Sequence, residues 1–160
     1  MARSSDKRLV EDLILSCTGG EVPSEIAQKA VRAICRYYGG QMIYIPVKKE
    51  NGSSAKNLRG IIADAVGDRH AEKILGKIMA LYGNISLYIP MERFAFKKTI
   101  ALEIYERSGI NGITMNDLAR EYGISLCYAY ILRKDGLKEK LKSSMPYLPF
   151  LEMSGNTNLD

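Results

Sequence analysis

Apolar residues recur at three- and four-residue steps through much of the chain, a pattern that predicts amphipathic helices. One helix is predicted from about Lys7 to Cys17 with Asp6 as its cap, and another from near Pro23 to a stop at Gly39. A short β-prone run, Gln41–Ile45, follows and is closed by Pro46. The expected inward faces of the two helices are Leu9, Val10, Leu13, Ile14 and Cys17, and Ile26, Ala27, Ala30, Val31, Ile34 and Cys35.

This plan of two helices and a strand occurs a second time. Residues 48–55 are expected to form a loop, residues 58–66 a helix, and a longer helix capped by Asp68 is expected to reach Tyr82. A second strand, Ile85–Ile89, is closed by Pro90. The apolar face of the longer helix comprises Ala71, Ile74, Leu75, Ile78, Met79, Leu81 and Tyr82.

The two stretches are an internal repeat with a constant offset. Tyr38-Gly39 and Tyr44-Ile45-Pro46 recur 44 positions later as Tyr82-Gly83 and Tyr88-Ile89-Pro90. Units of such repeats usually cannot bury their apolar faces alone, and a lone short strand needs a partner. The two strands should therefore pair with each other or with those of a second chain. Chance similarity of these short runs is the alternative explanation.

The last third of the chain has a different character. A helix is predicted over 94–107, with Phe96, Ile100, Ala101 and Ile104 facing inward, followed by a turn. Thr114 should cap a short helix to Tyr122, and a second short helix should run from Ser125 to about Lys134. The expected fold is mainly α with two short strands. We expect a duplicated helix-strand module at 1–90 (repeats about 7–46 and 55–90), a three-helix domain at 91–142, and an extended or disordered tail at 143–160.

Composition narrows the class of protein. The net charge of +5 favours a polyanionic partner without proving one. Three cysteines without a Cys-x-x-Cys and the single His70 suggest no disulfide framework, metal site or cofactor. His70 is better explained as an ordinary helix residue. The amino terminus does not resemble a secretory signal and no apolar run could span a bilayer, so we expect a cytoplasmic protein.

The run from Ile113 to Lys134 has a helix-turn-helix pattern. Ala119 is small enough for the second helix to approach, and Gly123 lies where the turn needs a left-handed residue. Ile124 is expected to fill the corner, and Ser125 to cap the second helix. In this motif the amino-terminal half of the second helix enters the major groove of DNA, so double-stranded DNA is the expected partner.

Residues of the second helix divide into inward and outward sets. Ala129, Ile131 and Leu132 are expected to pack inward. The candidates for base contacts are Ser125, Leu126, Cys127, Tyr128 and Tyr130, and those for phosphate contacts are Lys97, Lys98, Arg133, Lys134 and Lys138. The basic series continues through Lys140 and Lys142. The alternative for these lysines is a solvated face, interrupted by Asp135 and Glu139.

Two other classes compete with a DNA-binding regulator. The first is an interaction protein that uses the three-helix head to hold another protein, which Leu126, Tyr128 and Tyr130 would suit and Arg133 and Lys134 would not. The second is a tyrosine-based strand-transfer enzyme, suggested by the ten tyrosines. The chain shows no paired-carboxylate or glycine-rich phosphate motif, so we expect no enzyme.

Two stretches of the chain resemble the Mor/C family of phage transcription activators. They are Tyr38-Gly39-Gly40-Gln41-Met42-Ile43-Tyr44-Ile45-Pro46 and Leu118-Ala119-Arg120-Glu121-Tyr122-Gly123-Ile124-Ser125. The resemblance implies a homodimer that binds an inverted repeat and recruits RNA polymerase as an activator. It implies a hinge at Gly39, Gly40 and Gly83, and strand residues that approach DNA between half-sites, matched here by Gln41, Tyr44 and Tyr88.

The chain departs from this pattern because it has two helix-strand units and one helix-turn-helix. Asn84 and Ile85 stand where the first unit has Gly40 and Gln41. Our hypothesis is that the two units pair within one chain as a pseudo-dimer. One chain would then either bind a single half-site or dimerise through another surface, and no residue can be assigned to a contact with polymerase.

Overall fold

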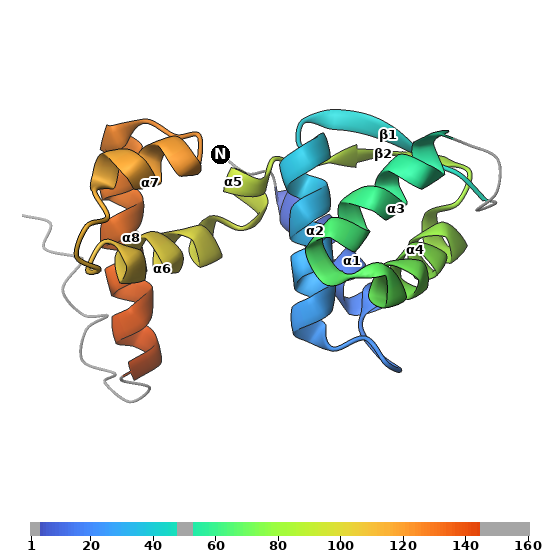
Figure 1. The fold of residues 1–160 in the computed structure, drawn as a ribbon, viewed down its shortest axis with the longest axis horizontal. Coiled ribbons are helices and arrows are strands. Elements are labelled where there is room, and N and C mark those ends of the chain that lie inside the picture. The colour runs from blue at the N-terminus through green and yellow to red at the C-terminus, as the bar shows by residue number, and fades with distance from the viewer. Residues whose placement is uncertain (1–3, 48–52, 145–160) are drawn as a thin grey trace, which may run out of the picture. The chain divides into compact units, whose positions relative to one another are not determined.

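Helices make up most of the protein, which is described by a computed structural model over residues 4–47 and 53–144 (Figure 1). Within these ranges there are eight helices and one two-stranded antiparallel sheet, so the predicted mainly helical fold with two short strands is confirmed. The chain divides into two compact units, residues 1–96 and 97–160. Each unit is described by itself below.

The first unit contains both strands. Its elements are α1 (Ser4–Cys17), α2 (Ser24–Tyr38), β1 (Gln41–Ile45), α3 (Ser53–Val66), α4 (Asp68–Tyr82), β2 (Ile85–Ile89) and α5 (Glu92–Ala95). Both strands have the predicted bounds, and they lie along one side of the helices α1 to α4 (Figure 1). Buried apolar side chains from all four helices and from Ile45 and Ile89 form the core.

The internal repeat is visible in the buried positions. The buried residues of α2 are Ala27, Ala30, Val31, Ile34 and Cys35, and those of α4 are Ala71, Ile74, Leu75, Ile78 and Met79. Adding 44 to each number of the first set gives the second set. The repeats α1-α2-β1 and α3-α4-β2 therefore bury equivalent faces, and each helps to cover the other because α2 packs on α3 and α1 on α4.

The two strands pair with each other, which decides between the two partners that the sequence left open. The register places Gln41 opposite Ile89 and Ile45 opposite Ile85, with Ile43 opposite Leu87 at the centre. Ile43 and Leu87 are themselves 44 positions apart, so the central pair consists of equivalent residues. The two repeats are consequently related by an approximate two-fold axis through this pair, as the subunits of a symmetric dimer are.

Matching turns lead into the strands. The Gly40 N–H donates to Ile89 O at 2.7 Å, and the Asn84 N–H donates to Ile45 O at 2.8 Å. Gly40 has φ +86° and Asn84 has φ +66°, a left-handed conformation that glycine adopts freely and asparagine tolerates better than most residues. The substitution of asparagine for glycine at position 84 therefore keeps the turn.

Several predicted helix ends were wrong. Helix α1 begins at Ser4, so Asp6 lies inside it, and α3 begins at Ser53 within the predicted loop. Asp68 is the first residue of α4, whose cap position is Gly67. Leu81, placed on the inward face, is 56% exposed because it follows the last buried turn of α4. Residues 48–52 of the predicted loop lie outside the described residues.

The second unit contains three helices, α6 (Lys97–Arg107), α7 (Met115–Glu121) and α8 (Leu126–Ser144). The prediction of one helix over 94–107 is wrong. Phe96, whose side chain is buried, belongs to neither helix and separates the end of α5 from the start of α6 in the sequence. The predicted end of α8 near Lys134 is also wrong, since the helix continues ten residues further to Ser144. Only residues 145–160 of the predicted tail lie outside the described residues.

Candidate nucleic-acid interface

The junction of α7 and α8 is built by local hydrogen bonds. Thr114 and Asp117 form a capping box at the start of α7, with each side chain bonded to the other's backbone N–H. After α7, Gly123 takes a left-handed φ of +60°, and the Ile124 N–H donates to Ala119 O at 2.9 Å. Ser125 Oγ then accepts from the Tyr128 N–H at 3.2 Å and caps α8. The left-handed turn predicted at Gly123 and the helix cap predicted at Ser125 are thus confirmed.

Helix α8 is fixed to α6 by close packing. Its buried residues, Ala129, Leu132 and Gly136, lie on one face at steps of three and four. A Cβ at Gly136 would lie 2.1 Å from the Ala101 carbonyl oxygen, so only glycine allows this approach of the two helices. Ile131, which we expected to pack inward, is 54% exposed because it lies a quarter turn away from Leu132 on the side facing away from α6.

Polar contacts fix α7 to α6. Arg107 donates to both carboxylate oxygens of Glu121, at 2.7 and 2.8 Å. The Tyr122 hydroxyl donates to Glu103 Oε2 at 2.7 Å, and burial together with this acceptor raises the pKa of Tyr122, so the hydroxyl stays protonated. These contacts give the turn between α7 and α8 a defined position on α6.

The predicted base-contacting residues lie on the first turns of α8. Leu126 is 38% exposed and Tyr130 is 51% exposed. Ser125 and Cys127 are also exposed, whereas Tyr128 is half-buried. The beginning of α8 therefore presents apolar, thiol and phenol groups to solvent, and it carries no charged residue before Arg133.

The acidic and basic side chains on the rest of α8 lie on different faces of the helix. Asp135 and Glu139, one turn apart, pair with the α6 lysines: Lys97 with Asp135 at 3.2 Å and Lys98 with Glu139 at 3.7 Å. Lys140 pairs with Glu106, and Lys142 with Glu139. Arg133, Lys134 and Lys138 are exposed, and none of them has an ion pair with any residue in the described ranges. The acidic residues thus face α6, while three cations face outward.

A second exposed surface is the outer face of the β1–β2 ribbon. Because side chains alternate along a strand, Met42, Tyr44, Ser86 and Tyr88 share the face that points away from the helices. Met42 is 62% exposed, Tyr44 51% and Tyr88 45%. Sequence reasoning identified both tyrosines and missed Met42 and Ser86, although the two-residue alternation could have found them. Gln41 is exposed at the strand end, on the face that carries Ile43 and Ile45.

The predicted hinge glycines lie at the ends of this ribbon. A Cβ at Gly39 would approach Cys35 O to 2.4 Å and Met91 Cα to 2.8 Å. A Cβ at Gly83 would approach Met79 O to 2.4 Å and Val47 Cγ2 to 3.4 Å. Val47 and Met91 are equivalent in the two repeats, but only Met91 comes close enough to exclude a side chain, because the distance to Val47 is an ordinary contact.

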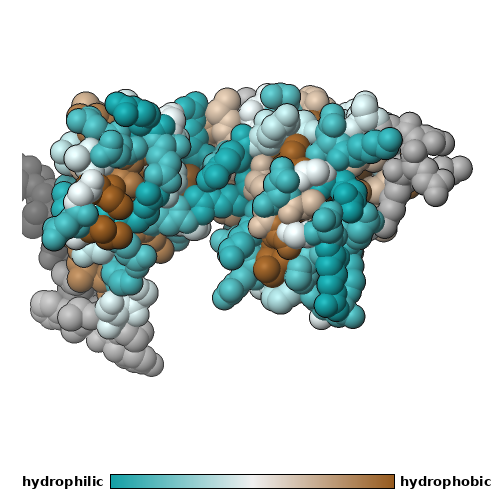
Figure 2. Space-filling model, viewed as in Figure 1, coloured by the Kyte–Doolittle hydropathy of each residue, from teal (hydrophilic) through white to brown (hydrophobic). Residues whose placement is uncertain are grey.

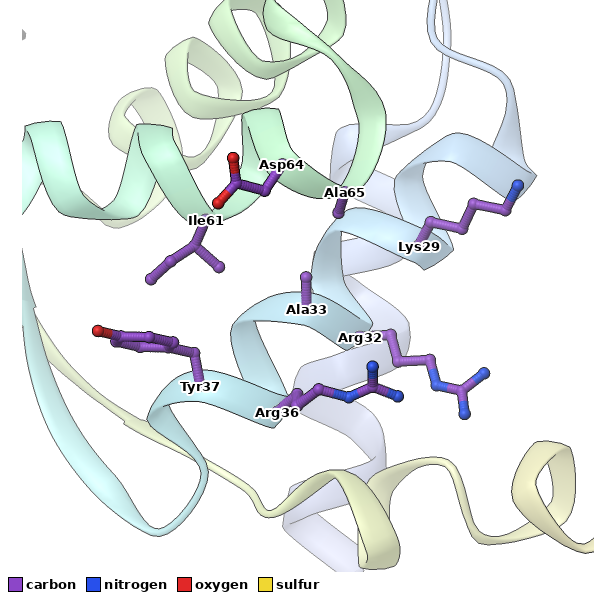
Figure 3. Close-up of a pocket in the computed structure, with 8 residues that line it drawn as sticks. All are labelled: Lys29, Arg32, Ala33, Arg36, Tyr37, Ile61, Asp64 and Ala65. Atoms are coloured by element: carbon purple, nitrogen blue, oxygen red, sulfur yellow. The ribbon is translucent and has the colours of Figure 1, made fainter. Parts of the chain in front are cut away.

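The first unit also has a hollow of about 430 Å³ between α2 and α3 (Figure 3). It is lined by Lys29, Arg32 and Arg36 of α2 and by Ile61, Asp64 and Ala65 of α3, among others. Glu92 of α5 binds both arginines: Arg32 Nε at 2.6 Å and Arg36 Nε at 2.9 Å. These contacts use the arginines to hold α5, so the hollow is a weaker site for an anion than the outer face of α8.

Two of the three cysteines, Cys17 and Cys35, are buried. Burial raises the pKa of the Cys17 thiol to about 11 and that of Cys35 to about 12, so both thiols stay protonated at neutral pH. Across residues 4–47 and 53–144 there is no group of His, Cys, Asp and Glu residues that could hold a metal ion. In the same ranges no helix is long and apolar enough to cross a bilayer. The face shown in Figure 2 is largely hydrophilic, with apolar patches between the polar residues.

The structure is that of a small, mainly helical protein whose α8 carries exposed cations, and comparison with known families identifies its family. Residues 47–146 match the Mor transcription activator family. The chain belongs to this family. The matched stretch contains β2 and all of α3 to α8, and it begins after β1. Searches of curated proteins and of solved structures gave no match.

Proposed function

We propose that this protein is a sequence-specific double-stranded DNA-binding transcription regulator of the phage activator type, and that α8 is its reading helix. The observation that carries the proposal is the sorting of charge on α8. Its acidic residues are paired with α6, and Arg133, Lys134 and Lys138 face outward without a partner among the described residues. A polyanion is the partner that this face suits, because phosphate contacts release counterions and supply affinity.

The position of each residue along α8 decides whether we assign it to base contacts or to phosphate contacts. The first turns would enter the major groove as a recognition helix does, with Ser125, Leu126, Cys127, Tyr128 and Tyr130 facing base edges. Tyrosine hydroxyls can donate to and accept from bases, and apolar atoms can contact thymine methyl groups. Arg133, Lys134 and Lys138 would bind phosphates, which fixes position rather than sequence preference.

The α6 lysines are proposed as secondary phosphate contacts. Lys98 is 74% exposed and its carboxylate partner is 3.7 Å away, whereas Lys97 is 47% exposed and closer to its partner. Exposed pairs of this kind are weak, so a phosphate can compete for the ammonium group. We expect Lys98 to contribute more than Lys97 for this reason.

The outer face of the ribbon is proposed as a second surface that contacts DNA. Tyr44 and Tyr88 occupy equivalent positions and are both exposed, and Gln41 lies at the strand end. The hinge role that the resemblance implies for Gly39, Gly40 and Gly83 remains a prediction. Family membership supports activation as the outcome, for which RNA polymerase would be the partner, and no residue is assigned to that contact. A regulator of this type would work in the cytoplasm, associated with the nucleoid when bound.

The test is selection of bound duplexes from a random pool, followed by affinity measurements at two salt concentrations. Tyr130→Ala should reduce discrimination at one or two base positions by about 10- to 100-fold, as expected for loss of one good base contact. Arg133→Ala should weaken binding to all sequences and lower the salt slope by about one.

Matched controls come from the first unit. Tyr37, 66% exposed, is the control for Tyr130, and Arg69, with 78% of its side chain exposed, is the control for Arg133. Equal effects of a variant and its control would show that α8 is not the reading surface. Absence of both sequence enrichment and salt dependence would refute DNA binding altogether.

A protein-binding role for the same head is the second candidate. It is favoured by the exposed apolar residues along α8, namely Leu126, Ile131, Leu137 and Leu141. A pool that yields no enrichment, together with retained folding of the head, would favour this candidate.

A further inference from the structure

The strand pairing found here occupies both strands within one chain. Each residue of β1 has its partner in β2, and the ladder is centred on the equivalent residues Ile43 and Leu87. The buried faces of α2 and α4 are likewise covered within the chain. The first unit is thus a complete two-fold arrangement made from a single polypeptide, and no second chain is needed to satisfy either strand.

The described residues contain one candidate reading helix for this two-fold arrangement. After β2 the chain continues into α5 and then into α6 to α8. At the equivalent point after β1, residues 53–66 form α3 of the second repeat. A symmetric dimer would carry a DNA-binding unit like α6 to α8 after each strand. Here β2 leads to α6 to α8, the head of this protein, and β1 leads to the second repeat.

The outer face of the ribbon is also unequal on its two sides. The equivalent residues Met42 and Ser86 differ in size and polarity. Tyr44 donates its hydroxyl to Asn84 Oδ1 at 2.8 Å, but the residue equivalent to Asn84 is Gly40, which offers Tyr88 no such acceptor. Any DNA against this face therefore meets a methionine on one side of the axis and a serine on the other.

The fixing of α5 breaks the symmetry further. Glu92 is held by Arg32 and Arg36 of α2, whereas the equivalent positions of α4 are Gly76 and Ala80, which cannot make ion pairs. Ion pairs to these helix positions therefore hold the segment after β2, and the corresponding positions cannot hold the segment after β1 in the same way.

From these asymmetries we infer that one chain, as a monomer, recognises an asymmetric duplex site that contains a single half-site for α8. This inference rests on the proposed DNA-binding function and departs from the inverted repeat that the family resemblance implied. The single head reads one half-site, and the unequal ribbon meets a non-palindromic flank.

The test is a gel-shift experiment with two lengths of the protein. The full chain and the full chain carrying an amino-terminal fusion are mixed on a duplex enriched from the random pool. One chain per site gives two shifted bands, one for each length. Two chains per site give a third band of intermediate mobility, which would overturn the inference while leaving DNA binding intact. A pool with no enriched duplex would instead refute the proposed function.

The enriched sequence provides an independent readout. A duplex with two inverted copies of the enriched motif should bind the first chain only about two-fold better than a duplex with one copy, the statistical factor for two independent sites. A gain of 100-fold or more would show that two chains bind together. In that case the double variant Leu137→Glu, Leu141→Glu would show whether the exposed leucines of α8 join them, because their loss would remove the intermediate band.

Discussion

The close packing of α6 and α8 at Gly136 makes a sharp prediction. A Cβ at this position would lie 2.1 Å from Ala101 O, 2.6 Å from Ala101 C and 2.8 Å from Tyr105 Cβ. Since ordinary contacts begin near 3.4 Å, the helices would have to separate by about 1.3 Å, the difference between 3.4 and 2.1 Å. Overpacking of this kind costs about 1–3 kcal/mol.

Helix propensity opposes this cost, because alanine is favoured over glycine in a helix interior by about 1 kcal/mol. We therefore expect Gly136→Ala to lower the unfolding free energy of the second unit by up to about 2 kcal/mol. For a small domain this corresponds to a fall in Tm of up to roughly 15 °C. Thermal and urea unfolding followed by far-UV circular dichroism would measure both quantities.

Gly60→Ala is the matched control. Gly60 lies inside α3, and a Cβ there would meet no atom within 4 Å. The same substitution should consequently raise stability by about 0.5–1 kcal/mol through helix propensity alone. If Gly136→Ala were equally stabilising, α6 and α8 could not pack as closely as described here.

Three further predictions concern the first unit. Burial of Glu92 raises its pKa, but hydrogen bonds from Arg36 and Arg32 outweigh this effect and hold the pKa below its ordinary 4.5. The stability that these hydrogen bonds provide is therefore present at neutral pH and is lost as pH falls through the lowered pKa. Glu92→Gln should cost about 1–2 kcal/mol at pH 7 and flatten this loss in melts recorded between neutral and acidic pH. Lys77 Nζ donates to the carbonyls of Cys17, Thr18 and Gly19, and Lys77→Met should cost about 1–2 kcal/mol in urea unfolding. Lys73→Met, which removes an ion pair with the exposed Glu21, should cost less than about 1 kcal/mol. Asn84→Ala should cost about 1 kcal/mol because φ is +66°, whereas Asn84→Gly should leave Tm unchanged or higher.

Hydrophobic periodicity and the positions of glycine and proline were sufficient to predict the two strands and most of the buried residues of α2 and α4. A Tyr-Gly pair before each strand and a proline after it gave both strands their observed bounds. The three- and four-residue steps in α2 and α4 identified residues that are buried in the structure. These signals are local, because each depends on the preference of a residue for one backbone conformation or on its alternation with polar neighbours.

The features that could not be predicted depend on contacts between distant residues. Gly136 suggests the end of a helix when the sequence is considered alone, yet α8 continues through it because Ala101 of α6 lies directly opposite. The pairing of Asp135 with Lys97 is invisible in the sequence for the same reason. Asp6 is a plausible cap by composition, but α1 starts two residues earlier. The candidate site itself was predicted only as a set of residues, and its sorting into paired and unpaired charges required the structure.

The covalent joining of β1 and β2 has a consequence for the amount of protein a cell must contain. Association of two separate chains depends on their concentration, and a sparse protein would be present largely as unpaired monomers. Linking the partners through α3 and α4 turns the encounter of the strands into an intramolecular event, whose equilibrium does not depend on the protein concentration. The ribbon therefore forms as completely with one molecule in a cell as with a thousand, and the dose of protein sets only how many sites are filled.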